Sequence, residues 1–246
     1  MRSSNPALSE RVFSENRGIA ATSDRMTIDG TINKTFLLFL FALVPAGFVW
    51  EQFYTGGIES ITTYMIIGVI GSFIMALLTI FMPHLAGYTA PIYAALEGLS
   101  LGGISAYMNS LYGGIVIQAV GLTFGIMFAM LVLYKTGTIK VTDKLRSIVM
   151  MGAFAIILMY LVTWIAGIFL PGVAYIHGNG AIGIGFSLLV IGIASFFLLL
   201  DFDFIERGAQ SGAPKYMEWY GAFSLMVTLV WLYLELLNLL RKLNSD

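Results

Sequence analysis

Four acidic side chains lie inside or at the ends of stretches that are otherwise apolar: Glu97, Asp201, Asp203 and Glu235. No Lys or Arg lies inside the same apolar stretches to neutralise them. An ionisable group in hydrocarbon costs at least about 2.5–3.5 kcal/mol and usually faces the interior of a helix bundle, where it marks an ion or proton pathway. Two acids that share one site titrate as a coupled pair, and their ionised oxygens suit Ca²⁺. These residue types therefore predict a proton sensor or a cation site.

The acids differ in how strongly their positions favour a pathway. Asp201 and Glu235 are the two that we expect to form the proton sensor or cation site and, when ionised, to suit Ca²⁺. Asp203 points to nearly the opposite helix face from Asp201, because residues two apart in a helix do not share a face, and we expect it to meet headgroups or Arg207. Glu218, beside Trp219, fits an interfacial charge. Glu97 fits a pathway or a neutral acid bonded to a neighbouring helix equally well.

The composition requires a lipid environment for the elements that carry these acids. Of the 246 residues, 58% are hydrophobic and 11% are charged, whereas a soluble domain is about one quarter charged. No Asp, Glu, Lys or Arg occurs between Ser147 and Leu200. A water-facing surface could not be built from such a stretch, so the sequence predicts an integral membrane protein.

Seven apolar segments have the length that a spanning helix needs, which is about 20 residues for a hydrocarbon core of about 30 Å. They are 35–50, 61–82, 88–107, 111–134, 147–170, 181–203 and 217–240. The predicted fold class is therefore all-α, a polytopic bundle of seven transmembrane helices. We expect a cytoplasmic tail at residues 1–33, a membrane domain at 34–242 and a short C-terminal tail at 243–246.

The basic residues predict the orientation of the chain, because Lys and Arg are retained on the cytoplasmic side. Eleven of the thirteen fall in the N-terminal tail and in the loops 134–147 and 204–216, which places the N-terminus in the cytoplasm. Arg241 and Lys242 are the two exceptions. A signal peptide is not expected, since the first apolar run follows a polar stretch without a cleavage site. This pattern fits a bacterial inner membrane.

Several classes of function are disfavoured by the same residues. The chain has no Cys, and its two histidines, His84 and His177, fit interfacial or loop positions better than a metal centre. No basic stripe suggests nucleic acid. Gly98 and Gly102, like Gly121 and Gly125, have the spacing of small residues that lets membrane helices approach closely, so we expect them to mediate packing.

Three motifs carry a resemblance to a known family. Residues 232–241 read LYLELLNLLR, residues 199–202 read LLDF, and residues 97–102 read EGLSLG. They resemble the closing helix, the end of the sixth span and the third-span signature of the Bax-inhibitor family, in its bacterial branch. The resemblance covers about residues 30–242 and leaves the preceding tail outside.

The resemblance implies a seven-helix, pH-sensitive calcium leak that is gated by a carboxylate pair from the sixth and seventh helices. Carried over by residue, the pair is Asp201 and Glu235, although the second acid is Glu where the family has Asp. A hairpin of the last two helices would separate these acids by about 20 Å in depth. Glu218 is level with Asp201 in that geometry and is the rival partner.

Two other classes of function remain as alternatives. The chain could be a non-conducting regulator that binds a membrane protease or a stress-response partner; the resemblance includes some bacterial relatives that are linked to a membrane protease. We do not expect an enzyme, because Ser100 and Ser187 lack both a nucleophile motif and a positioned base. No cofactor is expected beyond Ca²⁺ as the transported ion. The expected partners are the lipid bilayer and calcium ions.

Overall fold

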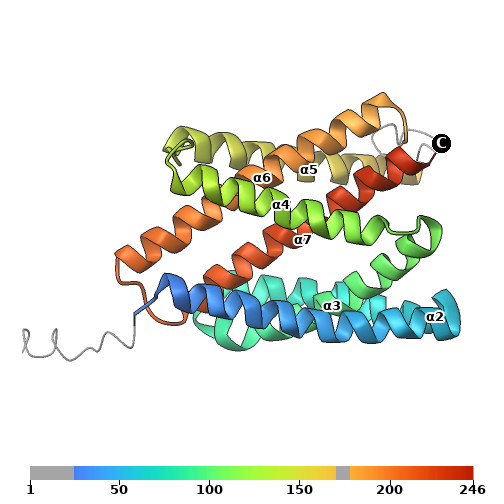
Figure 1. The fold of residues 1–246 in the computed structure, drawn as a ribbon, viewed down its shortest axis with the longest axis horizontal. Coiled ribbons are helices and arrows are strands. Elements are labelled where there is room, and N and C mark those ends of the chain that lie inside the picture. The colour runs from blue at the N-terminus through green and yellow to red at the C-terminus, as the bar shows by residue number, and fades with distance from the viewer. Residues whose placement is uncertain (1–24, 170–177, 246) are drawn as a thin grey trace, which may run out of the picture.

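The structure, a computed structural model, describes residues 25–169 and 178–245 and consists there almost entirely of helices (Figure 1). In chain order these are α2 (Ile28–Phe81), the 3₁₀ turn η3 (Pro83–Leu85), α3 (Ala86–Leu111), α4 (Ile115–Lys135), α5 (Asp143–Phe169), α6 (Ala181–Gln210) and α7 (Met217–Asn244). The one β contact in the described ranges is an isolated bridge between Arg25 and Pro214. The all-α prediction is confirmed.

Five of these helices are long and apolar enough to cross a membrane: α2, α4, α5, α6 and α7. The 26-residue α3 is long enough but less apolar, since it carries Glu97 and several Gly and Ser residues. Apolar side chains cover the outside of the bundle, with Phe36, Phe73 and Phe154 each more than 60% exposed. A soluble protein rarely leaves such large contiguous apolar patches open, so the composition and the fold together describe an integral membrane protein.

Helix α2 contains a break that accounts for two of the predicted segments. A straight helix of 54 residues would be about 81 Å long, far more than a bilayer core requires. At Gly57 the backbone leaves helical geometry with φ 74°, a conformation that a residue with a Cβ rarely adopts. The two halves of α2 therefore double back and lie side by side against α3 (Figure 1). The count of seven spans stays a prediction.

Two helices extend beyond the residues that the sequence assigned to the membrane domain. Helix α2 begins at Ile28, so residues 28–33 of the predicted cytoplasmic tail are helical. The cause is an N-terminal cap, because the Thr27 hydroxyl accepts a hydrogen bond from Gly30 N at 3.0 Å. Helix α7 likewise continues to Asn244, two residues past the predicted end of the membrane domain. The rest of the predicted tail, residues 1–24, lies outside the described residues.

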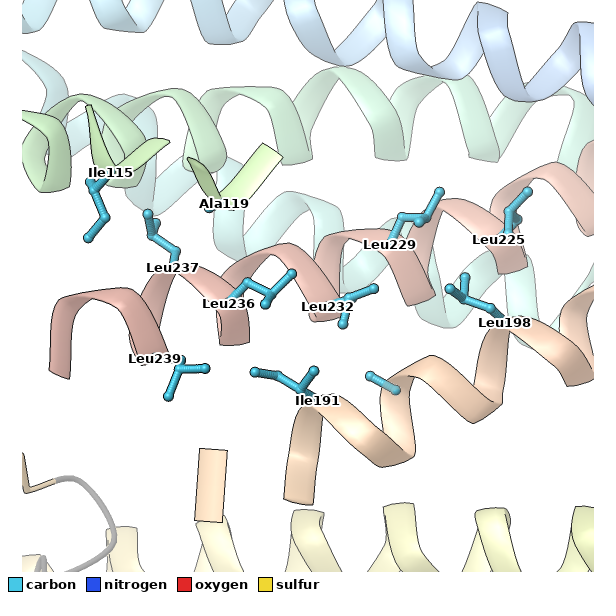
Figure 2. Close-up of a cluster of buried hydrophobic side chains, with 11 residues drawn as sticks. Ile115, Ala119, Ile191, Leu198, Leu225, Leu229, Leu232, Leu236, Leu237 and Leu239 are labelled. Atoms are coloured by element: carbon cyan, nitrogen blue, oxygen red, sulfur yellow. The ribbon is translucent and has the colours of Figure 1, made fainter. Parts of the chain in front are cut away.

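Helix α7 is the central element, packing against α2, α3, α4 and α6. Its leucines form most of a buried apolar cluster that also includes Ile115 and Ala119 of α4 and Ile191 and Leu198 of α6 (Figure 2). Figure 2 shows these side chains filling the space between the three helices. The cluster, which we call the leucine plug, occupies the middle of the α6–α7 interface.

The two glycine pairs behave differently. A Cβ at Gly98 or Gly102 would collide with the backbone of Ala42 or Ala46 in the first half of α2. This close approach confirms the packing role predicted for the first pair. Gly121 and Gly125 of α4 have no neighbour within 4 Å in the described part of the chain, so their predicted contact is not formed within it.

Candidate functional site

Asp201 is a buried carboxyl with incomplete hydrogen bonding. It lies on α6 and is 5% exposed. The Ser224 hydroxyl of α7 donates to its Oδ1 at 2.6 Å, and the hydroxyl of Thr228, one turn further along α7, also faces the carboxyl. Its Oδ2 is buried and has no hydrogen-bond partner among the residues that the structure describes. None of the ion pairs found among the described residues involves Asp201.

A buried carboxylate that lacks a cation is costly, because neutral hydroxyl groups do not offset the lost hydration of a full charge. Binding a proton removes that charge and gives Oδ2 a hydrogen to donate. Ser224 and Thr228 are spaced by four residues, so they lie on one face of α7. Asp201 is thus a buried acid at the contact between two helices whose charge a bound proton would remove.

Glu235 lies near the opposite end of α7 in a second polar cluster. It is 6% exposed; the Tyr160 hydroxyl of α5 donates to its Oε2 at 3.0 Å, and Asn238 Nδ2 donates to its Oε1 at 3.3 Å. Lys242 lies two turns further along α7, and the negative charge of Glu235 contributes to the electrostatic environment of its ammonium. This cation is one of the two basic residues that the charge pattern left on the outer side.

The structure does not bring Asp201 and Glu235 together. Asp201 contacts Ser224, which precedes Glu235 by eleven residues on the same helix, or about 16 Å along its axis. Leu229 and Leu232 of the leucine plug lie between the two levels on α7 (Figure 2). The two acids therefore lie on opposite sides of this apolar cluster and do not contact each other.

Glu218, the rival partner, does not contact Asp201 either. Its carboxylate is completely buried, and it accepts hydrogen bonds from the backbone N and the hydroxyl of Thr27, at 2.9 and 2.8 Å. It also pairs with Lys34 of α2 and, at 2.9 Å, with Lys215. Gly30 leaves the space that the carboxylate occupies, because a Cβ there would overlap it. We call this group of residues the Glu218 clamp.

The clamp joins the start of α2 to the α6–α7 loop. The Met26 N–H donates to the Ala213 carbonyl at 2.7 Å beside the Arg25–Pro214 bridge, and the Lys34 ammonium lies 5.5 Å from the centre of the Trp219 ring. A carboxylate at the N-terminus of α2 also interacts favourably with the helix dipole. Two cations and two donors satisfy this acid fully, so its arrangement is that of a structural anchor.

Asp203 is likewise matched by cations. Arg146 of α5 donates to one of its oxygens at 2.9 Å, and Arg207, one turn along α6, donates to the other at 2.8 Å. The contact with Arg207 that the sequence suggested is present. Asp203 therefore links α5 to α6 as a charged group.

Glu97 of α3 is half-buried and faces Ser72 in the second half of α2. Glu97 therefore lies between α2 and α3, and its neighbour Ser72 is not one of the residues that contact Asp201 or Glu235. It fits the interpretation of an acid bonded to a neighbouring helix. The described residues contain no group of three or more His, Cys, Asp or Glu that could hold a metal ion.

The sequence analysis identified the buried acids but missed most of the residues that contact them. Ser224 and Thr228 carry a local signal, namely two hydroxyls four residues apart in an apolar helix. Tyr160 and Lys34 carry none, because their contacts with Glu235 and Glu218 span 75 and 184 positions. Lys242 was noted only as an exception to the charge pattern. His177 lies outside the described residues.

Comparison with known proteins assigns the family. A family model described as Bax inhibitor 1 like matches residues 5–245, which includes the N-terminal tail that the motif resemblance left outside. No curated protein matches the chain. The family match covers nearly all of a helical chain whose motifs already resembled the Bax-inhibitor family. The chain therefore belongs to the Bax inhibitor 1 like family of integral membrane proteins.

Proposed function

We propose that this protein is a pH-sensitive cation leak, with calcium as the transported ion, and that Asp201 is its proton sensor. One observation carries the proposal. A carboxyl at the α6–α7 contact is 5% exposed, accepts a hydrogen bond from the Ser224 hydroxyl and keeps one oxygen without a partner among the described residues. Buried acids of membrane proteins that lack a cation partner commonly belong to ion or proton pathways.

The proton changes the contact between the two helices. The ionised carboxyl accepts hydrogen bonds from α7, whereas the protonated carboxyl also donates one and no longer carries a buried charge. A tenfold change in a conformational equilibrium requires about 1.4 kcal/mol, and an unpaired buried charge costs several kcal/mol. One proton on Asp201 is therefore sufficient to shift the population of an open state.

The second acid of the predicted pair takes a different role in this proposal. Glu235 lies on the far side of the leucine plug from Asp201, so in this proposal the two acids serve as separate cation contacts at different depths. A packed plug would be the closed state. Opening requires α6 and α7 to separate at Leu198 and Leu232, which are both fully buried.

The proposed orientation places the α6–α7 loop in the cytoplasm of a bacterial inner membrane. Lys34, Lys215, Arg146 and Arg207 support it, because the Glu218 clamp and Asp203 gather these four cations at the loop end of the bundle. Basic residues are retained on the cytoplasmic side of a membrane.

Calcium flux into liposomes that contain only this protein, measured between pH 5 and pH 8, tests the proposal. We expect a flux that depends on pH in the wild type and loses that dependence in Asp201→Asn. Glu59→Gln is the matched control, since Glu59 is an exposed acid outside the site and its variant should behave as the wild type. An unchanged pH profile in Asp201→Asn would contradict the proposed sensor.

Absence of flux at every pH would contradict conduction itself. The alternative would then be the non-conducting regulator of a membrane protease or stress-response partner. In that case Asp201 would be a structural hydrogen-bonding group.

A further inference from the structure

Three lysines, which we call the loop lysines, lie in and beside the connection between α4 and α5. Lys135 is the last residue of α4, Lys140 lies in the loop, and Lys144 is the second residue of α5. All three are exposed, and none of the ion pairs found among the described residues involves them. The function proposed above makes no use of these lysines.

Two acids of α6 lie beside this loop, and both are engaged by other groups. Asp203 accepts hydrogen bonds from Arg146 and Arg207, one on each carboxylate oxygen. Glu206 accepts a hydrogen bond from the hydroxyl of Tyr134, the residue before the first loop lysine. Within the described part of the chain, the charges of the loop lysines are therefore left for an anion outside the protein.

The loop has a defined backbone that holds the lysines at one end of the bundle. The Ile139 N–H donates to the Leu133 carbonyl at 3.3 Å, so the loop folds back over the last turn of α4. Arg207 of α6 donates to the Val141 carbonyl at 3.4 Å and ties the loop to a third helix. The loop thus lies at the same end of the bundle as the α6–α7 loop (Figure 1).

Exposed apolar side chains one helical turn away place the loop lysines at the level of lipid headgroups. Val132 precedes Lys135 by three residues and Ile148 follows Lys144 by four, so each lies on the same helix face as its lysine. Val132 and Ile148 are 43% and 49% exposed, and both belong to helices apolar enough to cross a membrane. A turn is about 5 Å long, and a lysine at a helix end extends its ammonium toward the headgroups.

We propose that the α4–α5 loop is a docking surface for anionic phospholipid headgroups, which the loop lysines bind. Residues 135–146 contain four basic residues and one acid, Asp143, so the segment has a net charge of +3. A basic cluster beside a spanning helix attracts an anionic membrane surface, and each lysine there strengthens the attraction about fivefold. The adjoining apolar faces favour a lipid over an acidic protein, because the lipid meets both the charge and the apolar side chains.

A reporter on the loop can test this inference, since the chain contains no Cys. Thr138→Cys places one fluorophore at an exposed position between the loop lysines. The full chain is reconstituted in phosphatidylcholine vesicles that contain a small fraction of spin-labelled phosphatidylglycerol or the same fraction of spin-labelled phosphatidylcholine. We expect the quenching to give an association constant at least fivefold larger for phosphatidylglycerol at low salt.

Charge variants separate the docking surface from a general preference of the protein. Lys140→Gln should lower the preference for phosphatidylglycerol by up to fivefold, whereas Lys140→Arg keeps the charge and should keep the preference. Asp143→Asn removes the one acid of the segment and should increase the preference. Arg241→Gln is the matched control, because it removes a cation near the C-terminal end of α7, at the other end of the bundle, and should have no effect at this reporter.

Four results would overturn the inference. They are equal quenching by the two lipids, a preference that survives when all three loop lysines are changed to Gln, an equal loss in Arg241→Gln, and a preference that persists in about 1 M salt, where charges are screened beyond about 3 Å. The loop lysines are exposed, so their variants should fold; if the triple variant does not, Lys140→Gln and Lys140→Arg decide the matter. Because no transport is measured, these results do not depend on whether the protein conducts calcium.

Discussion

Asp201 and Asp203 are two residues apart on α6, equally buried, and surrounded by opposite chemistry. Asp203 faces two guanidinium groups, from Arg146 and Arg207, at 2.9 and 2.8 Å. Asp201 faces hydroxyl groups of α7 and keeps one oxygen unpaired. Residues two apart in a helix point in different directions, so one acid faces α5 and the other faces α7.

The difference shows that the presence or absence of neighbouring cations decides whether a buried acid keeps its charge or can bind a proton. A carboxylate that is matched by cations keeps its charge, and losing that charge would leave the cations unpaired. Glu218 belongs with Asp203 in this respect, because Lys34 and Lys215 both contact it. Asp201 has no such counter-charge in the described part of the chain, so a proton can bind to it without breaking any ion pair seen there.

The largest expected effect comes from removing an anchor. Glu218→Gln should lower the free energy of unfolding by about 3–5 kcal/mol, because it leaves the Lys34 ammonium without its buried partner. Denaturant titration in detergent, followed by tryptophan fluorescence, measures this change. A decrease in the free energy of unfolding of less than about 1 kcal/mol would show that Glu218 is not a structural anchor.

A pair of glycine variants on α2 sharpens the same test. Gly30→Ala should destabilise the protein by about 1–3 kcal/mol, because the new Cβ overlaps the Glu218 carboxylate. Gly47→Ala is the matched control, since no atom lies within 4 Å of a Cβ at that position of the same helix. Equal effects of the two substitutions would contradict the packed clamp.

Asp203→Asn should have an intermediate effect, about 1–2 kcal/mol, because Arg146 and Arg207 are 44% and 57% exposed and water screens part of their charge. The same unfolding measurement applies. High salt should reduce the difference between variant and wild type. A difference that does not depend on salt would show that Asp203 acts through packing instead of charge.

Asp201→Asn should have the smallest effect on stability, within about 1 kcal/mol, since it removes a charge that has no counter-ion. Asn keeps an acceptor for Ser224. The variant should become more stable relative to the wild type as the pH rises, because the wild-type carboxyl then ionises in a buried position. Unfolding curves recorded at several pH values measure this trend, and a trend of the opposite sign would count against the assignment.

The elements of this fold were predictable from hydropathy, and the long-range partners were not. Apolar runs and turn residues such as Gly56-Gly57 located the helices, because backbone groups in lipid must be satisfied within each helix. Thr27 is a residue type that commonly caps helices, but the polar residues before it led to the assignment of residues 28–33 to the tail. The depth argument separated Asp201 from Glu235, as the structure does, but it placed Glu218 on the level of Asp201, whereas the residue that contacts Asp201 is Ser224, about 9 Å further along α7.

What the depth argument could not supply was the direction of each side chain around α7. Glu218 faces Lys34 of α2, whereas Ser224 and Thr228 face Asp201 of α6. The choice depends on how helices distant in sequence pack around α7, which local spacing does not encode. For the same reason, Lys242 was assigned to the outer water phase by its charge and lies buried against Gly183 and Ser187.

Infrared difference spectroscopy between pH 5 and pH 8 tests most directly the claim that Asp201 exchanges its proton while Asp203 stays charged. The carbonyl band of a protonated carboxylic acid should appear at the lower pH in the wild type and disappear in Asp201→Asn, with the purified protein in lipid. The same band should persist in Asp203→Asn. A band that survives in Asp201→Asn and is lost in Asp203→Asn would contradict the assignment of Asp201 as the switch.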